Sequence, residues 1–408
     1  MLLTLTFTIL LLFFSLPILF LTAEVFAALL PRNKEKQTET NKPRPSVAIL
    51  IPAHNEEDEI AATLKAIKEQ LFDHDRILVV ADNCNDRTVE IAQLNGAEVL
   101  ERLDAKHRGK GYALDFGMQF LKKNPPDVVI IFDADVTVEA DSVDRLARTA
   151  HLLKRPVQAK NLLEPPTDAD AKTRVSTFAF LFKNMVRPLG LSSLGGGCLL
   201  TGTGMAFPWD LIKNAPLASS NIVEDMQLGI DLAIAGNAPI FCPDATVKSK
   251  TAPNNEAAHA QRMRWEHGHL LTIYKQAGRT LKMAIKQQRF ELILLSFELA
   301  VPPLSSLVLL WCAAFFLSLI CSFAKLIPTN ILTGFTCLGM LLSLNIFLSW
   351  WRFGRHILSF SHILTIPLYI LWKTPIYLKF LLKPQKDWVR TERSPKDKAD
   401  SQKTNHTQ

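Results

Sequence analysis

The sequence predicts an α/β fold with a mostly parallel sheet and flanking helices, together with transmembrane helices at both ends of the chain. Short apolar runs alternate with segments of helical spacing between residues 46 and 154. This alternation is typical of strands that pair in parallel and carry helices on both faces. Long uncharged segments stand before and after this region in a chain of 408 residues, which is long enough for more than one domain.

Three apolar segments are long enough to cross a bilayer. Residues 2–23 carry no charged side chain, and at helical rise they cover the roughly 30 Å of a hydrocarbon core. The alternative is a cleaved signal peptide, which fits less well because no Lys or Arg precedes the run. Residues 299–324 and 326–351 predict a helical hairpin around Lys325 and "PTN". Residues 357–372 form a shorter run that we expect to be interfacial or re-entrant.

The basic residues predict the orientation. Lys and Arg crowd "PRNKEKQTETNKPRP" and "WRFGRH", which the positive-inside rule places in the cytoplasm. We therefore expect an integral protein of the inner or plasma membrane with a cytosolic middle region. The net charge of +7 fits contact with anionic lipid and gives no reason to expect a nucleic-acid partner. The predicted parts are a transmembrane helix 1–30, a basic linker 31–45, a cytosolic domain 46–250, interfacial helices 251–291, a transmembrane hairpin 292–351, an interfacial or re-entrant segment 352–383 and a polar tail 384–408.

Polar residues follow the predicted strands in "PAHNEE", "ADNCNDRT" and "DADV". Ligands of open α/β sheets bind beyond the carboxyl ends of the strands, so these three strand ends are expected to form one site. If Asp133 and Asp135 end a strand, they point to the same side, and a cation such as Mg²⁺ or Mn²⁺ would relieve their repulsion. Two solvated acids are the alternative. Neither a dinucleotide-binding glycine motif nor a P-loop motif is found.

Seven short motifs occur in order between about residues 46 and 270: "PAHNEE", "ADNCNDRT", "GKGYAL", "DADV", "GTGMAF", "VEDMQLGIDLAIAG" and "QRMRW". With this series the sequence resembles the membrane-bound family-2 glycosyltransferases of the GT-A fold. That group includes cellulose, chitin, hyaluronan and poly-N-acetylglucosamine synthases. One departure is "ADNCND" in place of the common Asp-Asp-Gly-Ser.

The resemblance implies that this protein is a hexosyltransferase that uses a nucleotide sugar, a UDP-sugar, as donor. The D-x-D motif implies a metal site at Asp135 with Asp133 as its partner, for Mg²⁺ or Mn²⁺. "VED" implies that Asp225 is the catalytic base, with Glu224 beside it. Trp265 is implied on the acceptor side, where Gly202 and Gly204 in "TGTGMAF" would let the backbone approach the sugar closely. A plain turn is the alternative for the two glycines. The residues implied in donor binding are Glu56, Asp82, Lys110, Asp133, Gln261, Arg264 and Trp265.

Physical arguments support part of these roles. Sugar transfer needs charge stabilisation of the departing diphosphate, which a metal at Asp135 and the cation Arg264 would supply. Asp225 begins a predicted helix, where backbone N–H groups are expected to keep it ionised. The plainer alternatives are an ordinary helix-start acid for Asp225 and a packing role for Trp265. His267 and His269 stand on different faces of a predicted helix and are not expected to bind metal.

The acceptor is expected to be a polysaccharide or a lipid-linked glycan, with partner subunits for export in exopolysaccharide or cell-envelope glycan synthesis. Processive synthesis and single transfer both remain open, because the resembling synthases have more transmembrane helices. A different function is a non-catalytic nucleotide-binding regulator or scaffold in the membrane, which would have no need for a base. A transporter would place ionisable residues inside several transmembrane helices, and only Glu24 and Glu298 lie near helix ends.

Overall fold

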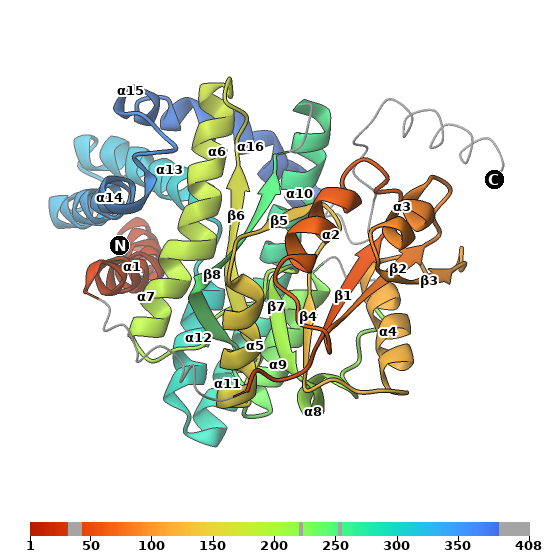
Figure 1. Cartoon of the computed structure of the whole chain (residues 1–408). Coiled ribbons are helices and arrows are strands. Elements are labelled where there is room, and N and C mark those ends of the chain that lie inside the picture. The colour runs from red at the N-terminus through yellow and green to blue at the C-terminus, as the bar shows by residue number, and fades with distance from the viewer. Residues whose placement is uncertain (32–42, 220–222, 252–254, 383–408) are drawn as a thin grey trace.

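The computed structural model describes residues 1–31, 43–219, 223–251 and 255–382. Its centre is an eight-stranded sheet with the order β3-β2-β1-β4-β7-β6-β8-β5 (Figure 1). The strands are β1 Val47–Ala53, β2 Arg76–Asp82, β3 Glu98–Arg102, β4 Val128–Ile131, β5 Val136–Val138, β6 Val157–Glu164, β7 Met205–Pro208 and β8 Ile240–Lys250.

The first half of the sheet is parallel, as predicted. Strand β1 pairs in parallel with β2 and β4, and β2 pairs in parallel with β3. The carboxyl ends of β1, β2 and β4 therefore meet at one edge, which is the edge predicted for the site. The second half is mixed, because β7 is antiparallel to β4 and β6. The short strand β5 follows the D-x-D segment and pairs antiparallel with β8. The sequence did not predict β5 as a separate strand.

Helices cover both faces of the sheet, and its central strands β1, β2, β4 and β7 are accordingly almost entirely buried. Alternate residues of β1 illustrate this: Ile49 and Ile51 belong to one apolar core, and Ala48 and Leu50 belong to the other. The first core includes side chains of α2 Ile60–Lys68, α3 Thr88–Leu94 and α5 Ser142–Leu153, and the second includes side chains of α4 Lys110–Leu121, α8 Trp209–Ile212 and α9 Glu224–Ile234. A strand buried on both faces needs a continuous apolar sequence.

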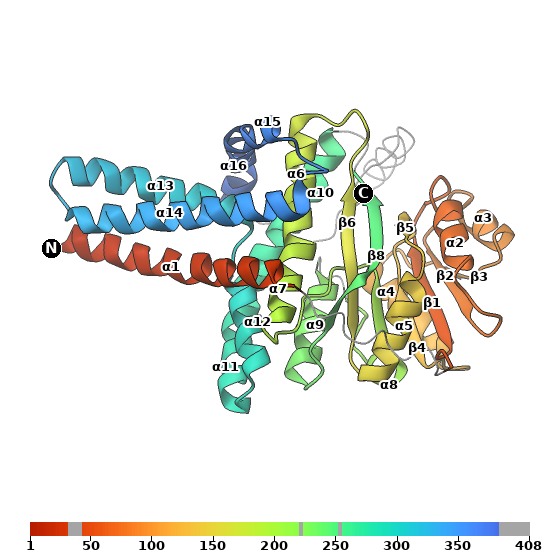
Figure 2. The same ribbon diagram turned by 60° about the vertical axis from the view of Figure 1, so that its left-hand side comes forward.

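Three helices are long and apolar enough to cross a membrane: α1 Leu2–Leu29, α13 Leu304–Phe323, and α14 Thr329–Ser349 with its extension to Gly354. They lie side by side and extend away from the sheet (Figure 2). The hairpin of α13 and α14 confirms the expected pair of helices around Lys325, whose φ of 55° makes the turn. Helix α13 begins later than predicted because Pro302 and Pro303 precede it.

A continuous helical rod lies between the sheet and the three apolar helices (Figure 2). It consists of α6 Ala171–Leu181, the π-helical segment η1 Phe182–Val186 and α7 Arg187–Ser193. Helix α7 packs directly on α1, and a Cβ on Gly190 would lie only 1.9 Å from the backbone oxygen of Glu24. Such a close approach requires glycine. The rod therefore joins the α/β domain to the first apolar helix.

The remaining helices lie around this junction. They are α10 Asn255–Thr272, η2 Ile273–Ala277, α11 Gly278–Gln287, α12 Phe290–Ala300, η3 Trp350–Gly354, α15 Phe360–Ile363 and α16 Ile366–Leu382. The segment 357–372, expected as one interfacial run, is divided between α15 and the start of α16. Helix α16 packs against α6, α10 and α13. It therefore covers one side of the space between the sheet and the apolar helices. Residues 32–42 of the predicted basic linker and the tail beyond residue 382 lie outside the described residues.

Candidate functional site

A cavity of about 1860 Å³ begins at the carboxyl ends of β1, β2 and β4 and reaches the ends of α1 and α13. The polar residues after all three strands line it, and so do side chains of the rod, of α10 and of α16. The predicted site residues that line this cavity are Glu56, Asp82, Lys110, Asp133, Asp135, Glu224, Asp225, Gln261, Arg264 and Trp265. The tertiary structure therefore brings together residues that are up to about 200 positions apart in the sequence.

The D-x-D segment is a turn between β4 and β5. Because β4 ends at Ile131, strand alternation does not direct Asp133 and Asp135, and that part of the prediction was wrong. Both acids still line the cavity. The Asp133 backbone N–H donates to Thr203 Oγ1 at 3.0 Å, and its carboxylate accepts a hydrogen bond from Lys110. The turn is thus held by the segment before β7 and by α4.

Lys110 is the first residue of α4 and follows Gly109, whose φ is 130°. Its Nζ also donates to the backbone oxygen of Gly202 at 2.7 Å. Burial alone would lower the pKa of Lys110, but the nearby carboxylates of Asp133, Glu224 and Asp225 raise it above its usual value. Lys110 is therefore a fixed positive charge among the acids.

The two predicted acceptor glycines have different surroundings. Gly202 has a φ of 86°, and a Cβ there would lie 3.2 Å from Asp225 Oδ2 and 3.5 Å from Lys110 Nζ. Gly204 has a φ of 66°, and a Cβ there would lie 2.9 Å from the side chains of Ala159 and Val247. Gly202 thus leaves room beside the acids, whereas packing on the sheet accounts for Gly204.

Glu224 and Asp225 begin α9, as predicted. Removal from solvent raises the pKa of Glu224 to about 8, and the neighbouring charge of Asp225 adds to the shift. Removal from solvent also raises the pKa of Asp225, although the Met226 N–H and the cations Lys110 and Lys183 oppose it. The Met226 N–H at the helix start does favour the ionised form, as expected, but desolvation has the larger effect and the net pKa of Asp225 is raised.

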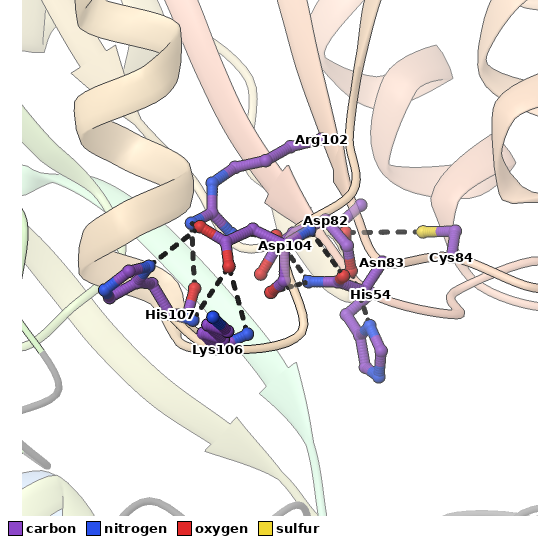
Figure 3. A network of polar contacts seen from close by, with 9 residues as sticks. His54, Asp82, Asn83, Cys84, Arg102, Asp104, Lys106 and His107 are labelled. Carbon is purple, nitrogen blue, oxygen red and sulfur yellow. Dashed lines mark hydrogen bonds and ion pairs between the residues drawn. The ribbon is translucent and has the colours of Figure 1, made fainter.

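Asp82 ends β2 and lies in a network of polar contacts (Figure 3). Its Oδ1 accepts hydrogen bonds from Arg102 at 2.6 Å and from Asn83 Nδ2 at 2.9 Å, and its backbone oxygen accepts one from His54 Nδ1 at 2.6 Å. Arg102 is 9% exposed. Sequence reasoning missed Arg102, which comes from the end of β3 and holds Asp82 in place.

Helix α10 carries the three residues of the Q-x-x-R-W motif to the opposite wall of the cavity. The ring of Trp265 lies 5.3 Å from that of Phe180 on α6, tilted by 43°. Trp265 therefore has a packing partner and also faces the cavity. The next residue, Glu266, accepts hydrogen bonds from Lys373 and from Tyr377 Oη of α16, the latter at 3.2 Å. These contacts join α10 to α16.

The described residues contain no group of three or more His, Cys, Asp or Glu side chains that could hold a metal ion. The question is therefore whether the two carboxylates of Asp133 and Asp135 suffice to hold a metal ion. One or two carboxylates suffice for Mg²⁺, which takes its other ligands from water and substrate phosphates, so the two acids fit a metal that binds together with a diphosphate. His267 and His269 lie buried in α10, and His267 Nε2 donates to the Ile376 backbone oxygen at 2.9 Å.

Sequence reasoning also missed polar residues on the side of the cavity near the apolar helices. Lys183 lies in η1 and lines the cavity, and His269 of α10 lines it as well. A signal existed for Lys183, which interrupts the apolar segment "STFAFLFKNMV". No such signal marks His269, because a histidine in a helix is ordinary without knowledge of its neighbours.

A model of the family "Glycosyltransferase like family 2" matches residues 43–268, more than half of the chain. The chain belongs to glycosyltransferase-like family 2. Among curated proteins, it is 28% identical over 281 residues to a probable glycosyltransferase, YdaM, of Bacillus subtilis. This match covers 65% of each chain. It is 26% identical over 239 residues to a probable glucomannan 4-beta-mannosyltransferase of Arabidopsis thaliana, covering 55% of this chain and 43% of the relative.

Among solved structures, the chain is similar to the mannosyltransferase PcManGT of Pyrobaculum calidifontis in complex with GDP-Man and Mn²⁺. The TM-score is 0.56 at 17% identity, and the match covers 90% of this chain and 99% of that one. This likeness confirms the predicted GT-A fold of the family-2 domain. The matches to the curated relatives span about two thirds of the Bacillus protein and less than half of the Arabidopsis protein. The narrower resemblance to polymer synthases stays a prediction.

Proposed function

We propose that this protein is a membrane-bound inverting glycosyltransferase that moves a sugar from a UDP-sugar to a hydroxyl group of a glycan or lipid-linked acceptor. The pathway that it would serve is the synthesis of an exopolysaccharide or of a cell-envelope glycan. One observation carries the proposal: acids and cations from five separate segments line a single cavity. These residues are Asp82, Lys110, Asp133, Asp135, Asp225 and Arg264. A non-catalytic nucleotide-binding protein would need Asp82 but not the half-buried acids Glu224 and Asp225.

Asp82 is the proposed contact of the donor nucleoside. Arg102 and Asn83 occupy its Oδ1, and none of the described residues donates to Oδ2, so this oxygen can accept a hydrogen bond from a ribose hydroxyl. The ion pair with Arg102 also fixes the orientation of the Asp82 carboxylate. Glu56 lies on the neighbouring strand end, where its N–H donates to Thr88 Oγ1 at 2.8 Å.

The donor diphosphate is proposed to lie between the D-x-D turn and α10. Arg264 and Lys110 supply positive charge on its two sides, and Asp135 with Asp133 would hold the metal ion. When bound there, Mg²⁺ or Mn²⁺ would neutralise charge on the diphosphate. Lys110 also positions Asp133 through their ion pair. This arrangement stabilises the leaving group where negative charge develops.

Asp225 is the proposed base, and Glu224 is proposed to assist by sharing a proton with it. Asp225 takes the proton of the acceptor hydroxyl as its oxygen attacks the anomeric carbon, while the bond from that carbon to the diphosphate oxygen breaks. A direct displacement of this kind inverts the anomeric centre. Gly202 leaves the space beside Asp225 Oδ2 in which an acceptor hydroxyl fits.

The membrane part of the proposal rests on α1, α13 and α14. The positive-inside rule then places the α/β domain in the cytoplasm, where nucleotide sugars occur. A site at the ends of these helices has access both to a soluble donor and to an acceptor held in the bilayer.

The test is a transfer assay with purified full-length protein in detergent. A panel of radiolabelled nucleotide sugars is supplied with Mn²⁺, Mg²⁺ or chelator, and the size and anomeric configuration of products are analysed. We expect turnover with one class of donor and an inverted linkage. Donor binding without turnover by both the native protein and Asp225→Asn would contradict catalysis and favour the binding protein. A ladder of long products would establish processive synthesis, and one added sugar would establish single transfer.

A further inference from the structure

The membrane-side part of the cavity contains charges that the transfer reaction does not use. Here the cavity is lined by Leu21 of α1, by Leu191 of α7 and by residues 301–305 before and at the start of α13. With about 1860 Å³ in total, the cavity is larger than the roughly 300–1,000 Å³ of an ordinary small-molecule site. A second ligand therefore has room next to the donor.

Lys183 is the cation that stands out in this part. Its neighbours are paired: Arg187 forms ion pairs with Glu24 and Glu298, and Lys373 forms one with Glu266. Lys183 has no hydrogen bond and no ion pair within the described part of the chain. Burial lowers its pKa despite the nearby charge of Glu266. Lys183 is half-buried in the wall of the cavity. An ammonium that loses much of its water without gaining a partner is destabilising, so its presence here favours an anionic partner that is not part of the chain.

His269 lies in the same region and also lines the cavity. Its side chain is 3% exposed, and its Nε2 has no hydrogen-bond partner among the described residues. Burial lowers the pKa of His269 well below its usual value, and the charge of Lys183 adds to this effect. The imidazole is therefore neutral, and one ring N–H can donate a hydrogen bond. A cation and a neutral donor side by side are suited to a phosphate oxygen.

The surroundings indicate where this phosphate comes from. The cavity reaches the ends of two helices that are long and apolar enough to cross a membrane, so an apolar chain attached to the anion can leave between them into the bilayer. Lys183 is also close enough to Asp225 for its charge to oppose the rise of that pKa. A head group that is bound at Lys183 can thus place a hydroxyl near Asp225.

We propose that Lys183, assisted by His269, binds the phosphate of a lipid acceptor whose hydroxylated head group receives the sugar. This assignment rests on the proposed transferase function and specifies its acceptor. Lys183 is a binding residue and takes no part in the chemical step. A neutral polysaccharide acceptor would have no group that pairs with the half-buried ammonium ion.

The test measures binding separately from turnover. Full-length protein in detergent is titrated with dioctanoyl phosphatidylglycerol, with dioctanoylglycerol as the neutral lipid, and with glycerol phosphate and a glucuronate oligosaccharide as soluble anions. We expect the phospholipid to bind most tightly. Lys183→Met should weaken its binding at least about 30-fold, since breaking a buried charge pair at an interface costs 2 kcal/mol or more. Lys183→Arg should restore most of the affinity, and dioctanoylglycerol should bind both variants alike.

Two controls separate this proposal from protein damage and from failure of the transferase function. UDP binding should be unchanged in Lys183→Met, whose thermal midpoint should equal or exceed that of the native protein because an unpaired charge is removed. Lys65→Met removes an exposed lysine on α2 and should change nothing. Equal phospholipid binding by Lys183→Met and native protein would overturn the proposal, as would equal binding of glycerol phosphate or the glucuronate oligosaccharide. Lys183-dependent phospholipid binding without sugar transfer would instead contradict the transferase function alone.

Discussion

Lys110 Nζ donates a hydrogen bond to the backbone oxygen of Gly202, with 2.7 Å between the two atoms. This contact ties the start of α4 to the segment before β7 and places a positive charge between Asp133 and Asp225. The position of Gly202 is therefore set by the contact with Lys110 as well as by its own positive φ.

Gly202→Ala should lower turnover more than it lowers stability. The positive φ costs an alanine about 1–2 kcal/mol, and the added methyl group would lie 3.2 Å from Asp225 Oδ2. The matched control is Gly195→Ala, where φ is 85° and a Cβ has nothing within 4 Å. Both variants should lose similar stability in thermal unfolding, but only Gly202→Ala should lose activity. Equal activity of the two would show that space beside Asp225 is not needed.

Asp225→Asn should reduce kcat by about 10²- to 10⁴-fold, the usual contribution of a general base. Donor binding should change little, because the amide keeps the size of the side chain. Asp231→Asn, on the same helix and in contact with Arg279, serves as the control and should retain activity. Rates of sugar transfer and UDP-sugar affinity are the measurements. A large loss of affinity with kcat unchanged would contradict the role of a base.

As the pH is lowered, kcat/KM should begin to fall at a pH higher than the pKa of an ordinary carboxylate. The pKa of Glu224 is raised to about 8 and that of Asp225 is raised as well. A base must be ionised, so kcat/KM rises as the pH increases through the raised values and is lost below them. The two acids are neighbours and titrate as a pair. A profile of kcat/KM that stays flat from pH 8 to pH 5 would be inconsistent with this assignment.

Removal of metal should abolish transfer, and Asp135→Ala should raise the Mn²⁺ concentration needed for half-maximal rate at least about 10-fold, the lower end of ligand effects. Asp133 is bound to Lys110, so Asp133→Asn should disturb the position of Lys110 as well as the metal. The exposed Asp73 provides the control, Asp73→Ala. Full activity in chelator, or an unchanged metal requirement of Asp135→Ala, would exclude the metal site.

Arg187→Met should destabilise the junction between the α/β domain and α1 by about 3–5 kcal/mol, the usual cost of breaking a buried ion pair. Arg187 Nε donates to Glu24 Oε2 at 3.2 Å, and its other end contacts Glu298. All three side chains are buried, and the variant leaves two carboxylates without their cation. Unfolding in detergent provides the measurement. Glu24→Gln should cost less, because Arg187 keeps one carboxylate partner.

The local elements could be predicted from the sequence because each has a local cause. The helix at Thr88–Leu94 ends before Gly96, whose φ is 84°, as expected of a glycine after a helix. Pro328 precedes α14 and marks its start. The D-x-D carboxylates were placed at the correct edge of the sheet because ligand sites follow the ends of parallel strands. Their turn was missed because strand β5 depends on pairing with β8, more than 100 residues later.

The sequence by itself determined the order of strands and helices, the three long apolar segments and the series of motifs, because periodicity, apolar length and turn residues act over short distances. Only the tertiary structure decided that Arg102 holds Asp82 and that Lys110 pairs with Asp133. It also decided that Lys183 meets no ion-pair partner among the residues that the structure describes. These relationships depend on which distant segments meet and on how fully they exclude water. Desolvation raises the pKa of Asp225 as well, and it is a property of the assembled cavity rather than of any segment of the chain.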